Sequence, residues 1–377
     1  MTALGQERQT GEQESIRRPL SPQPLVARFL SIAFSCIALV LAFLGLFEWD
    51  VPLTRFVRSL NDIQRDHLAN PWLAQLSDVG DRLGRGESLV IISVLILAVG
   101  FGLKYESWKA AGWRSLLGHG VAAGVSNLVK HAIGRPRPKF MHAGNLELSP
   151  VAGSGWDSFP SGHTTASFAV ATVLSEKFPR WRWVFLSLAI AIAASRIVRG
   201  SHFVTDVAGG AVMGHVIGSV VARPWREWRG SIESALFEVT PLLAAVLAVV
   251  WTIGYQSSDA WAVAHWIGAG VVFTMFGLSG HVLLVVKAAK APPWLSMSAT
   301  QSFIGLGLGM ATGSLWVMAT ILCVCLAHWL RSGWGVEAAA ASEPARYGLL
   351  IKEAALVLAV LFGLLLVVDL RGALPML

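Results

Sequence analysis

The stretch that decides the fold class is residues 29–47, FLSIAFSCIALVLAFLGLF, which contains no charged residue. A helix of this length crosses the roughly 30 Å hydrocarbon core of a bilayer, because each residue adds about 1.5 Å. Nine further apolar stretches follow, at 88–103, 115–131, 164–178, 183–199, 204–222, 239–255, 266–286, 303–328 and 354–370. The sequence therefore predicts an all-α integral membrane protein with about ten transmembrane helices.

The composition of the 377 residues supports the same class. Hydrophobic residues make up 54% and charged residues 14% of the chain, whereas about a quarter of a soluble domain is charged. These values exclude a disordered chain and an ordinary cytosolic enzyme. The net charge of +7 is typical of the cytoplasmic loops of a membrane protein, so we expect no nucleic-acid partner.

The polar segments predict how the chain is divided. Residues 1–24 are rich in Gln, Glu, Arg and Pro and are expected to form a cytoplasmic tail. The stretch 223–238 carries three arginines and marks the boundary between two membrane modules. We therefore expect a six-helix domain over residues 25–225 and a four-helix C-terminal module of unknown role over residues 226–377.

Two short helices are expected outside the apolar stretches. The apolar side chains of residues 51–65 share one helical face, which indicates a helix on the membrane surface or one packed on the protein itself. Asn70 and Pro71 are typical of a helix start, with Asn at the cap and Pro in the first turn.

The loop charges predict the orientation in the membrane. With the N-terminus inside and ten alternating spans, both termini are cytoplasmic. Inside loops then carry slightly more Lys and Arg than outside loops, and the difference becomes about twofold when six outside cations are set aside as members of polar motifs. These six are Lys130, Arg135, Arg137, Lys139, Arg196 and Arg199. The alternation places three polar motifs on the same, non-cytoplasmic, surface.

The first shared feature of these motifs is positive charge near helix ends, at Lys130, Arg137 and Arg196. A lone cation at the bilayer centre costs about 2.5–3.5 kcal/mol, so three cations drawn together require an anion. A phosphate group fits, since it carries a charge of about −1.5 to −2 and several strong acceptors. Taken singly, each cation is also explained by a side chain that reaches to the lipid headgroups.

The second feature is Pro160-Ser161-Gly162-His163, directly before an apolar helix. Glycine permits close backbone approach, and the free N–H groups of a helix N-terminus bind anions. His163 adds a group that exchanges protons near neutral pH. The alternative is an ordinary helix start.

The third feature is Ser195-Arg196 followed by His202 and Asp206. Because His202 and Asp206 are four residues apart, they share one helical face. A carboxylate bound to one ring nitrogen fixes the tautomer and makes the other nitrogen more basic, as a nucleophilic histidine requires. The alternative is a structural His–Asp pair.

Some motifs are absent from the sequence. It contains no Gly-x-x-x-x-Gly-Lys-Ser/Thr loop and no His-Glu-x-x-His motif. We therefore expect neither an ATP-dependent pump of that type nor a zinc hydrolase, and we predict no cofactor and no metal site.

The three motifs together resemble those of the type 2 phosphatidic acid phosphatases, the membrane branch of the superfamily that includes the vanadium haloperoxidases. The family motifs are Lys-x6-Arg-Pro, Pro-Ser-Gly-His and Ser-Arg-x5-His-x3-Asp, and this chain has all three in order. The resemblance implies a six-helix core with the site on the non-cytoplasmic side. It covers residues up to about 222, so the last four predicted spans have no counterpart in it.

The resemblance also implies roles for single residues. His202 would attack phosphorus and form a phosphohistidine, with Asp206 holding it, and His163 would protonate the leaving oxygen and later activate water. The phosphoryl oxygens would be bound by Lys130, Arg137 and Arg196, assisted by Ser161, Ser195 and the backbone of Gly162. Arg135 is an auxiliary candidate, because Arg135-Pro136 repeats the Arg-Pro pair two residues earlier.

The expected function is hydrolysis of a lipid phosphate by an enzyme of the membrane, most simply the bacterial cytoplasmic membrane. Candidate substrates are phosphatidate, phosphatidylglycerol phosphate, undecaprenyl diphosphate and a lipid A phosphate. Two alternatives stay open: a phosphotransferase that passes the phosphoryl group to a second lipid or sugar, and a carrier or partner-binding protein with an accessory phosphatase module. The expected partners are membrane lipids, and the sequence leaves the oligomeric state open.

Overall fold

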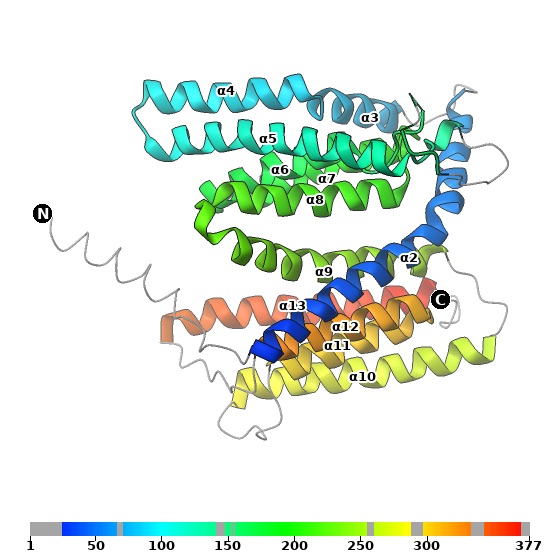
Figure 1. Ribbon diagram of the computed structural model, residues 1–377. Helices are drawn as coiled ribbons and strands as arrows, with labels where there is room; N and C mark the ends of the chain where they lie inside the picture. The colour runs from blue at the N-terminus through cyan, green and yellow to red at the C-terminus, as the bar shows by residue number, and fades with distance from the viewer. Residues whose placement is uncertain are drawn as a thin grey trace, which may run out of the picture.

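The structure is a computed structural model that describes residues 25–65, 71–140, 148–151, 153, 155–254, 260–287, 297–332 and 343–370 (Figure 1). The predicted cytoplasmic tail, residues 1–24, lies outside these ranges. Within them the long elements are all α-helices, as predicted: α2 Leu25–Arg65, α3 Pro71–Leu83, α4 Gly86–Gly102, α5 Glu106–Ile133, α6 Gly162–Lys177, α7 Arg182–Val198, α8 Val204–Ala222, α9 Trp228–Gly254, α10 Ala260–Lys287, α11 Met297–Ala311, α12 Leu315–Ser332 and α13 Glu343–Leu370.

Five helical segments in the described part of the chain are long and apolar enough to cross a membrane. They are Leu25–Val57, Pro179–Val198, Val204–Ala222, Trp225–Gly254 and Ala264–Val285. A sixth arises if Ser77–Leu83 and Gly86–Gly102, which meet at 57°, form one bent span. The protein is therefore an integral membrane protein, while the count of ten spans stays a prediction.

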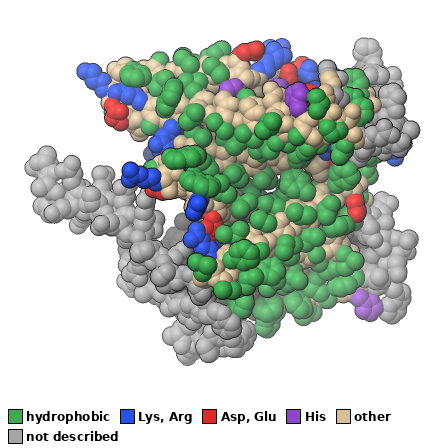
Figure 2. All heavy atoms as spheres, viewed as in Figure 1, with side chains coloured by type: hydrophobic (Ala, Val, Ile, Leu, Met, Phe, Trp, Pro, Cys, Tyr) green, Lys and Arg blue, Asp and Glu red, His purple; other side chains and the backbone are tan. Residues whose placement is uncertain are grey.

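The surface agrees with this assignment. Figure 2 shows hydrophobic side chains over most of the visible described face. Large apolar residues in the middle of three candidate spans are exposed, among them Leu188, Leu242 and Val272. An exposed surface made largely of such side chains is typical of a protein surrounded by lipid.

The helices form two stacked groups. In Figure 1, α3 to α8 make the upper group and α10 to α13 the lower one, with α9 between them and α2 crossing from the lower group to the upper. A hydrophobic core joins the groups where α2, α9 and α12 meet, built on Leu46, Leu247 and Val317, all fully buried. The first helix thus packs on the predicted C-terminal module, and the division near residue 225 stays a prediction.

Two helix predictions are wrong in detail. Residues 51–65 form no separate helix, because α2 continues through Pro52 to Arg65. Proline removes one backbone N–H from the helix. On either side of it the side chains of Asp50 and Thr54 are buried, and Asp50 accepts a hydrogen bond from the N–H of Thr205, which holds this part of the chain in place. By contrast, the predicted start of a helix at Pro71 is confirmed by α3.

The predicted span 303–328 is also wrong, because it consists of two helices, α11 and α12. The chain turns at Gly313, whose φ of 69° is in the left-handed region that glycine tolerates best. The hydroxyl of Thr312 donates to the carbonyl of Gly309, and the hydroxyl of Ser314 accepts from the N–H of Val317. Small polar residues thus end α11 and begin α12, while the hydropathy of the sequence stays high enough to suggest one continuous span.

Candidate active site

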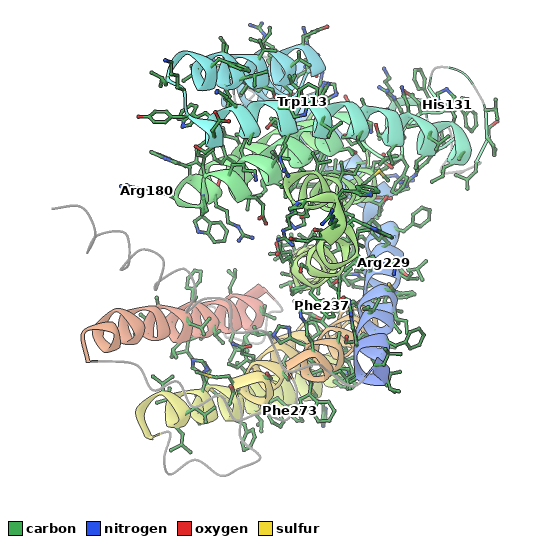
Figure 3. The ribbon with its side chains drawn as sticks, turned by 60° about the vertical axis from the view of Figure 1, so that its left-hand side comes forward. Trp113, His131, Arg180, Arg229, Phe237 and Phe273 are labelled. Atoms are coloured by element: carbon green, nitrogen blue, oxygen red, sulfur yellow. The ribbon has the colours of Figure 1, made fainter. Side chains whose placement is uncertain are left out.

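The candidate site lies where α5 and α7 end and α6 and α8 begin. Figure 3 shows His131, the neighbour of Lys130, at one side of the upper group and Arg180, which follows α6, at the other. Because α6 and α8 start where α5 and α7 stop, the three motifs meet at one end of the bundle. The connection from α5 to α6 adds residues 155–161 to the same place.

His202 is buried in the short loop before α8. Its Nδ1 lies 2.9 Å from the backbone carbonyl oxygen of Ser158. Since a carbonyl oxygen only accepts, Nδ1 carries the proton and the lone pair is on Nε2. Burial lowers the pKa of His202 and so favours the neutral ring. Asp206 acts in the opposite direction, but the effect of burial is larger. The geometry therefore presents an uncharged imidazole whose lone pair lies on Nε2.

Asp206 lies in the first turn of α8 and is fully buried. One carboxylate oxygen accepts from the hydroxyl of Ser158 at 2.5 Å and from the N–H of Phe203 at 2.8 Å. The same oxygen lies 3.7 Å from Nδ1 of His202, beyond hydrogen-bond distance. Asp206 therefore acts on His202 through its charge and through Ser158, whose carbonyl makes the direct contact.

Arg135 is buried behind Asp206 rather than among the other cations. Its guanidinium donates to Asp206 and to Asp50 of α2, each at 2.6 Å. It also lies over the rings of Phe47 and Phe203, with its central carbon 5.2 and 4.3 Å from the ring centres. These contacts occupy Arg135 as a support for Asp206, which differs from the phosphate-binding role that we predicted for it.

Lys130 and Arg137 face a carboxylate that the sequence motifs did not include. Arg137 binds Asp157 through two parallel hydrogen bonds of 2.8 and 2.6 Å. Nζ of Lys130 lies 3.7 Å from the same carboxylate. Gly162 is close by, since a Cβ at that position would be 3.8 Å from Nζ of Lys130.

Arg196 and His163 face a second such carboxylate. Arg196, at the end of α7, donates to Asp81 of α3, and Nε2 of His163 lies 3.7 Å from the same Asp81 oxygen. Burial and the positive charges of Arg196 and Lys130 lower the pKa of His163 to about 4, against the opposing charge of Asp81. The two imidazoles and the cations of all three motifs thus share one region of the structure.

The remaining predicted residues have structural contacts. Ser161 is buried at the start of α6, where its hydroxyl accepts from Thr164 at 3.0 Å and its N–H donates to the carbonyl of Asp206 at 3.0 Å. Ser195 donates to the carbonyl of Ile192 at 2.6 Å and packs against Gly80 of α3. Ser161 therefore joins the motifs, whereas Ser195 anchors α3.

Asp157 is ionised at neutral pH. Burial alone would raise its pKa, but the hydrogen bonds and charge of Arg137 and the charge of Lys130 lower the pKa to about 2. Three carboxylates therefore lie in the region. Asp157 pairs with Lys130 and Arg137, Asp81 pairs with Arg196, and Asp206 lies behind His202.

Four residues of this network were absent from the motif-based prediction: Asp50, Asp81, Asp157 and Ser158. Ser158 had a usable signal, because it lies two residues before the Pro-Ser-Gly-His motif. Asp50 lies at the end of the first apolar stretch, Asp81 in the short helix α3 and Asp157 in a loop, and a carboxylate at such positions is ordinarily a solvated group. Among the described residues, no group of three or more His, Cys, Asp or Glu side chains could hold a metal ion.

The fold and the site define an all-helical membrane protein with two histidines and several cations gathered at one end of a helix bundle. The family model described as the PAP2 superfamily matches residues 111–230, which include all three motifs. The chain belongs to the PAP2 superfamily, which confirms the resemblance to the type 2 phosphatidic acid phosphatases.

Known proteins resemble parts of the chain. A lipid A 1-phosphatase of Rhizobium etli is 34% identical over 160 residues, which are 37% of this chain and 68% of that protein. A lipid A 1-phosphatase of Rhizobium johnstonii is 39% identical over 92 residues, or 24% of this chain and only 38% of that protein. A crystal structure of a transmembrane PAP2 type phosphatidylglycerolphosphate phosphatase from Bacillus subtilis has 24% identity and a TM-score of 0.38, and the match covers 51% of this chain and 94% of that one.

Proposed function

We propose that this protein is a lipid phosphatase that works through a phosphohistidine on His202. The observation that carries the proposal is the hydrogen bond from Nδ1 of His202 to the carbonyl of Ser158, which leaves the lone pair on Nε2, in a region rich in cations. Family membership and the names of the two Rhizobium relatives support the same reaction class.

In the first step Nε2 of His202 attacks phosphorus in line with the leaving group. The N–P bond forms as the P–O bond breaks, and His163 transfers a proton to the departing oxygen. Because burial and Arg196 lower the pKa of His163 to about 4, the step requires that the negative charge of the bound phosphate raises this pKa, so that the substrate binds together with the proton that His163 donates. The imidazole of His202 becomes cationic when phosphorylated, and the buried carboxylate of Asp206 stabilises that charge.

In the second step a water molecule attacks phosphorus. His163, now neutral, takes a proton from the water, the N–P bond breaks, and inorganic phosphate leaves. Lys130, Arg137 and Arg196 compensate the charge that develops on the phosphoryl oxygens in both steps. This requires their side chains to exchange the carboxylates of Asp157 and Asp81 for phosphate oxygens.

The proposed substrate is an amphiphile whose terminal phosphate lies at the headgroup plane. The site lies at helix ends, so a lipid held in the bilayer presents its phosphate there without leaving the membrane. We propose the bacterial cytoplasmic membrane as the location and its non-cytoplasmic face as the side of the site. Positive charge in the remaining loops supports this orientation.

Assays of purified wild type, His202→Ala and His163→Ala test the proposal. Phosphate release from phosphatidate, phosphatidylglycerol phosphate, undecaprenyl diphosphate and lipid A is measured with and without a chelator. We expect release by the wild type in both conditions and a loss of at least about a hundredfold in each variant. An acid-labile phosphoenzyme that is present in the wild type and absent in His202→Ala identifies the intermediate. Wild-type rates in either variant contradict the mechanism.

A second candidate function, transfer of the phosphoryl group to another lipid, is favoured by a cavity in the C-terminal part. The cavity has a volume of about 530 Å³ and lies between α9, α11, α12 and α13, with mainly apolar walls. Space of this kind suits an acyl or prenyl chain of an acceptor. Product analysis with labelled substrate decides between the two functions, since label found only as inorganic phosphate excludes transfer.

A further inference from the structure

The side chain of Asp157 occupies the position of a ligand. It accepts two parallel hydrogen bonds from Arg137, and its carboxylate lies 3.7 Å from Nζ of Lys130. Arginine binds phosphate in the same way, through two parallel N–H···O bonds to two oxygens of the anion, and a lysine beside it adds charge. Asp157 therefore imitates the anion that the proposed function assigns to this place.

The backbone holds Asp157 in this position. Two backbone hydrogen bonds join the segments that contain Arg137 and Asp157, from the N–H of Arg137 to the carbonyl of Gly155 at 2.9 Å and from the N–H of Ser158 to the carbonyl of Arg135 at 3.0 Å. The N–H of Gly155 also reaches the Asp157 carboxylate at 3.3 Å. These bonds hold residues 155–158 beside residues 135–137, so the contact between Asp157 and Arg137 follows from the path of the loop.

The carboxylate is nonetheless able to leave. Its side chain is 32% exposed, whereas the side chain of Lys130 is 12% exposed. A carboxylate at the mouth of a pocket regains water when it turns outward, so its displacement costs far less than the removal of a buried ion. The cations stay behind, and an incoming anion finds them already placed.

This arrangement makes binding depend on the charge of the ligand. A phosphodiester in a lipid headgroup carries one negative charge, no more than the carboxylate that it would replace. A terminal phosphate carries a charge of about −1.5 to −2 and has a third free oxygen, so it gains more from the same cations. A bilayer offers phosphodiesters in great excess, and a bare cationic pocket would bind them.

Given the proposed function, we propose that Asp157 is a specificity-determining residue, an internal anion that only a terminal phosphate displaces effectively and that excludes the phosphodiesters of the surrounding lipids. Asp81 on Arg196 makes a comparable contact, but it also lies beside His163. Asp157 contacts neither imidazole in the described contacts, so it is the residue on which the idea is tested.

The experiment compares the wild type with Asp157→Asn and Asp157→Glu in mixed micelles. Hydrolysis of a lipid phosphomonoester is measured against two competitors, inorganic phosphate and phosphatidylglycerol. We expect the inhibition constant of inorganic phosphate to fall roughly tenfold or more in Asp157→Asn, since one repulsive charge is lost. Phosphatidylglycerol should inhibit this variant and leave the wild type and Asp157→Glu nearly unaffected.

The matched control is Asp78→Asn. Asp78 is an exposed carboxylate of α3 paired with Arg199 at 3.0 Å, so the variant removes the same charge away from Lys130 and Arg137. It should show the inhibition constants of the wild type. If it tightens phosphate binding as strongly as Asp157→Asn, a general charge effect replaces the specific one and the inference is overturned.

Other outcomes also decide the question. Unchanged or weaker inhibition of Asp157→Asn by phosphate overturns the inference, because damage to the fold weakens binding and cannot strengthen it. A variant that does not fold gives the carboxylate a structural role and overturns the inference as well. If Asp157→Asn folds but turns over too slowly, binding of inorganic phosphate to the purified protein by calorimetry replaces the kinetic assay. A wild type that neither binds phosphate nor hydrolyses any lipid phosphate contradicts the proposed function itself.

Discussion

Arg135 joins two buried carboxylates, those of Asp50 on α2 and Asp206 on α8, with a hydrogen bond of 2.6 Å to each. Asp50 additionally accepts from the backbone N–H of Thr205 at 3.0 Å and from its hydroxyl at 2.5 Å. The first helix of the chain is thereby connected to the first turn of α8, which carries the carboxylate behind His202. Since α2 also packs on α12, this link couples the site to the C-terminal part of the protein.

Replacement of Asp50 by asparagine should destabilise the protein and slow the reaction. Arg135 would keep only one of its two carboxylates in a buried environment, and breaking a buried pair costs about 3–5 kcal/mol. We expect kcat to fall at least about tenfold with little change in KM, because Asp50 does not contact phosphate. Thermal unfolding and steady-state kinetics check this, with Asp78→Asn as an exposed control. A fall in stability at unchanged kcat would limit Asp50 to a structural role.

Gly80→Ala should displace α3. A Cβ at Gly80 would lie 2.5 Å from Oγ of Ser195, so α3 or α7 must shift, at a cost of about 1–3 kcal/mol. α3 carries Asp81, and we therefore expect lower activity through Arg196 and His163 as well as a lower melting temperature. Gly120→Ala is the matched control, since no atom lies within 4 Å of the added methyl group. Equal activity of both variants would show that the position of α3 is unimportant.

Leu247→Ala should loosen the contact between α2, α9 and α12. Leu247 is fully buried in that core, and removal of a buried leucine costs about 2–5 kcal/mol. The reference variant is Leu242→Ala on the same helix, because Leu242 is 66% exposed. We expect a lower melting temperature for Leu247→Ala alone, accompanied by a smaller loss of activity through α2. A drop of equal size in both variants would contradict the packing described above.

The pH dependence of the Asp157 contact has a definite sign. The pKa of Asp157 is lowered to about 2, chiefly by Arg137 acting against burial, whereas an unfolded aspartate has a pKa of about 4. The stabilisation is thus fully present above about pH 4 and is lost as the pH falls to about 2. The difference in melting temperature between wild type and Asp157→Asn should stay constant above about pH 5 and disappear in acid. A difference that changes near neutral pH would point to another titrating group.

The sequence motifs named residues that meet in space because the topology of a helix bundle limits where they can go. Lys130 ends one helix and His163 begins the next, and the same relation holds for Arg196 and His202, so alternating directions bring the pairs to one end. The partners of the cations were not predictable in this way. Asp157, Asp81 and Asp50 belong to a loop, a short helix and the end of an apolar stretch, and only tertiary packing shows which cation each one meets.

The helix boundaries show the same limit. A proline usually disturbs a helix, yet α2 continues through Pro52. The reason is that Asp50, two residues earlier, is held by a buried hydrogen bond from α8. In residues 311–314 the reverse is true, since an apolar profile hides a turn that depends on one glycine with positive φ. Hydropathy indicates which segments are stable inside a membrane, but it does not indicate where the backbone turns within such a segment.

The contact between Ser158 and His202 has a consequence for mutagenesis. The acceptor is a main-chain carbonyl, which every amino acid supplies, so no substitution at position 158 deletes it. An alanine scan would detect only the loss of the Ser158 hydroxyl that donates to Asp206, and would not detect the carbonyl that orients His202. The path of the backbone at Ser158 determines the tautomer of His202. Only an insertion, a deletion or an ester in place of the peptide bond would therefore test how much this carbonyl contributes.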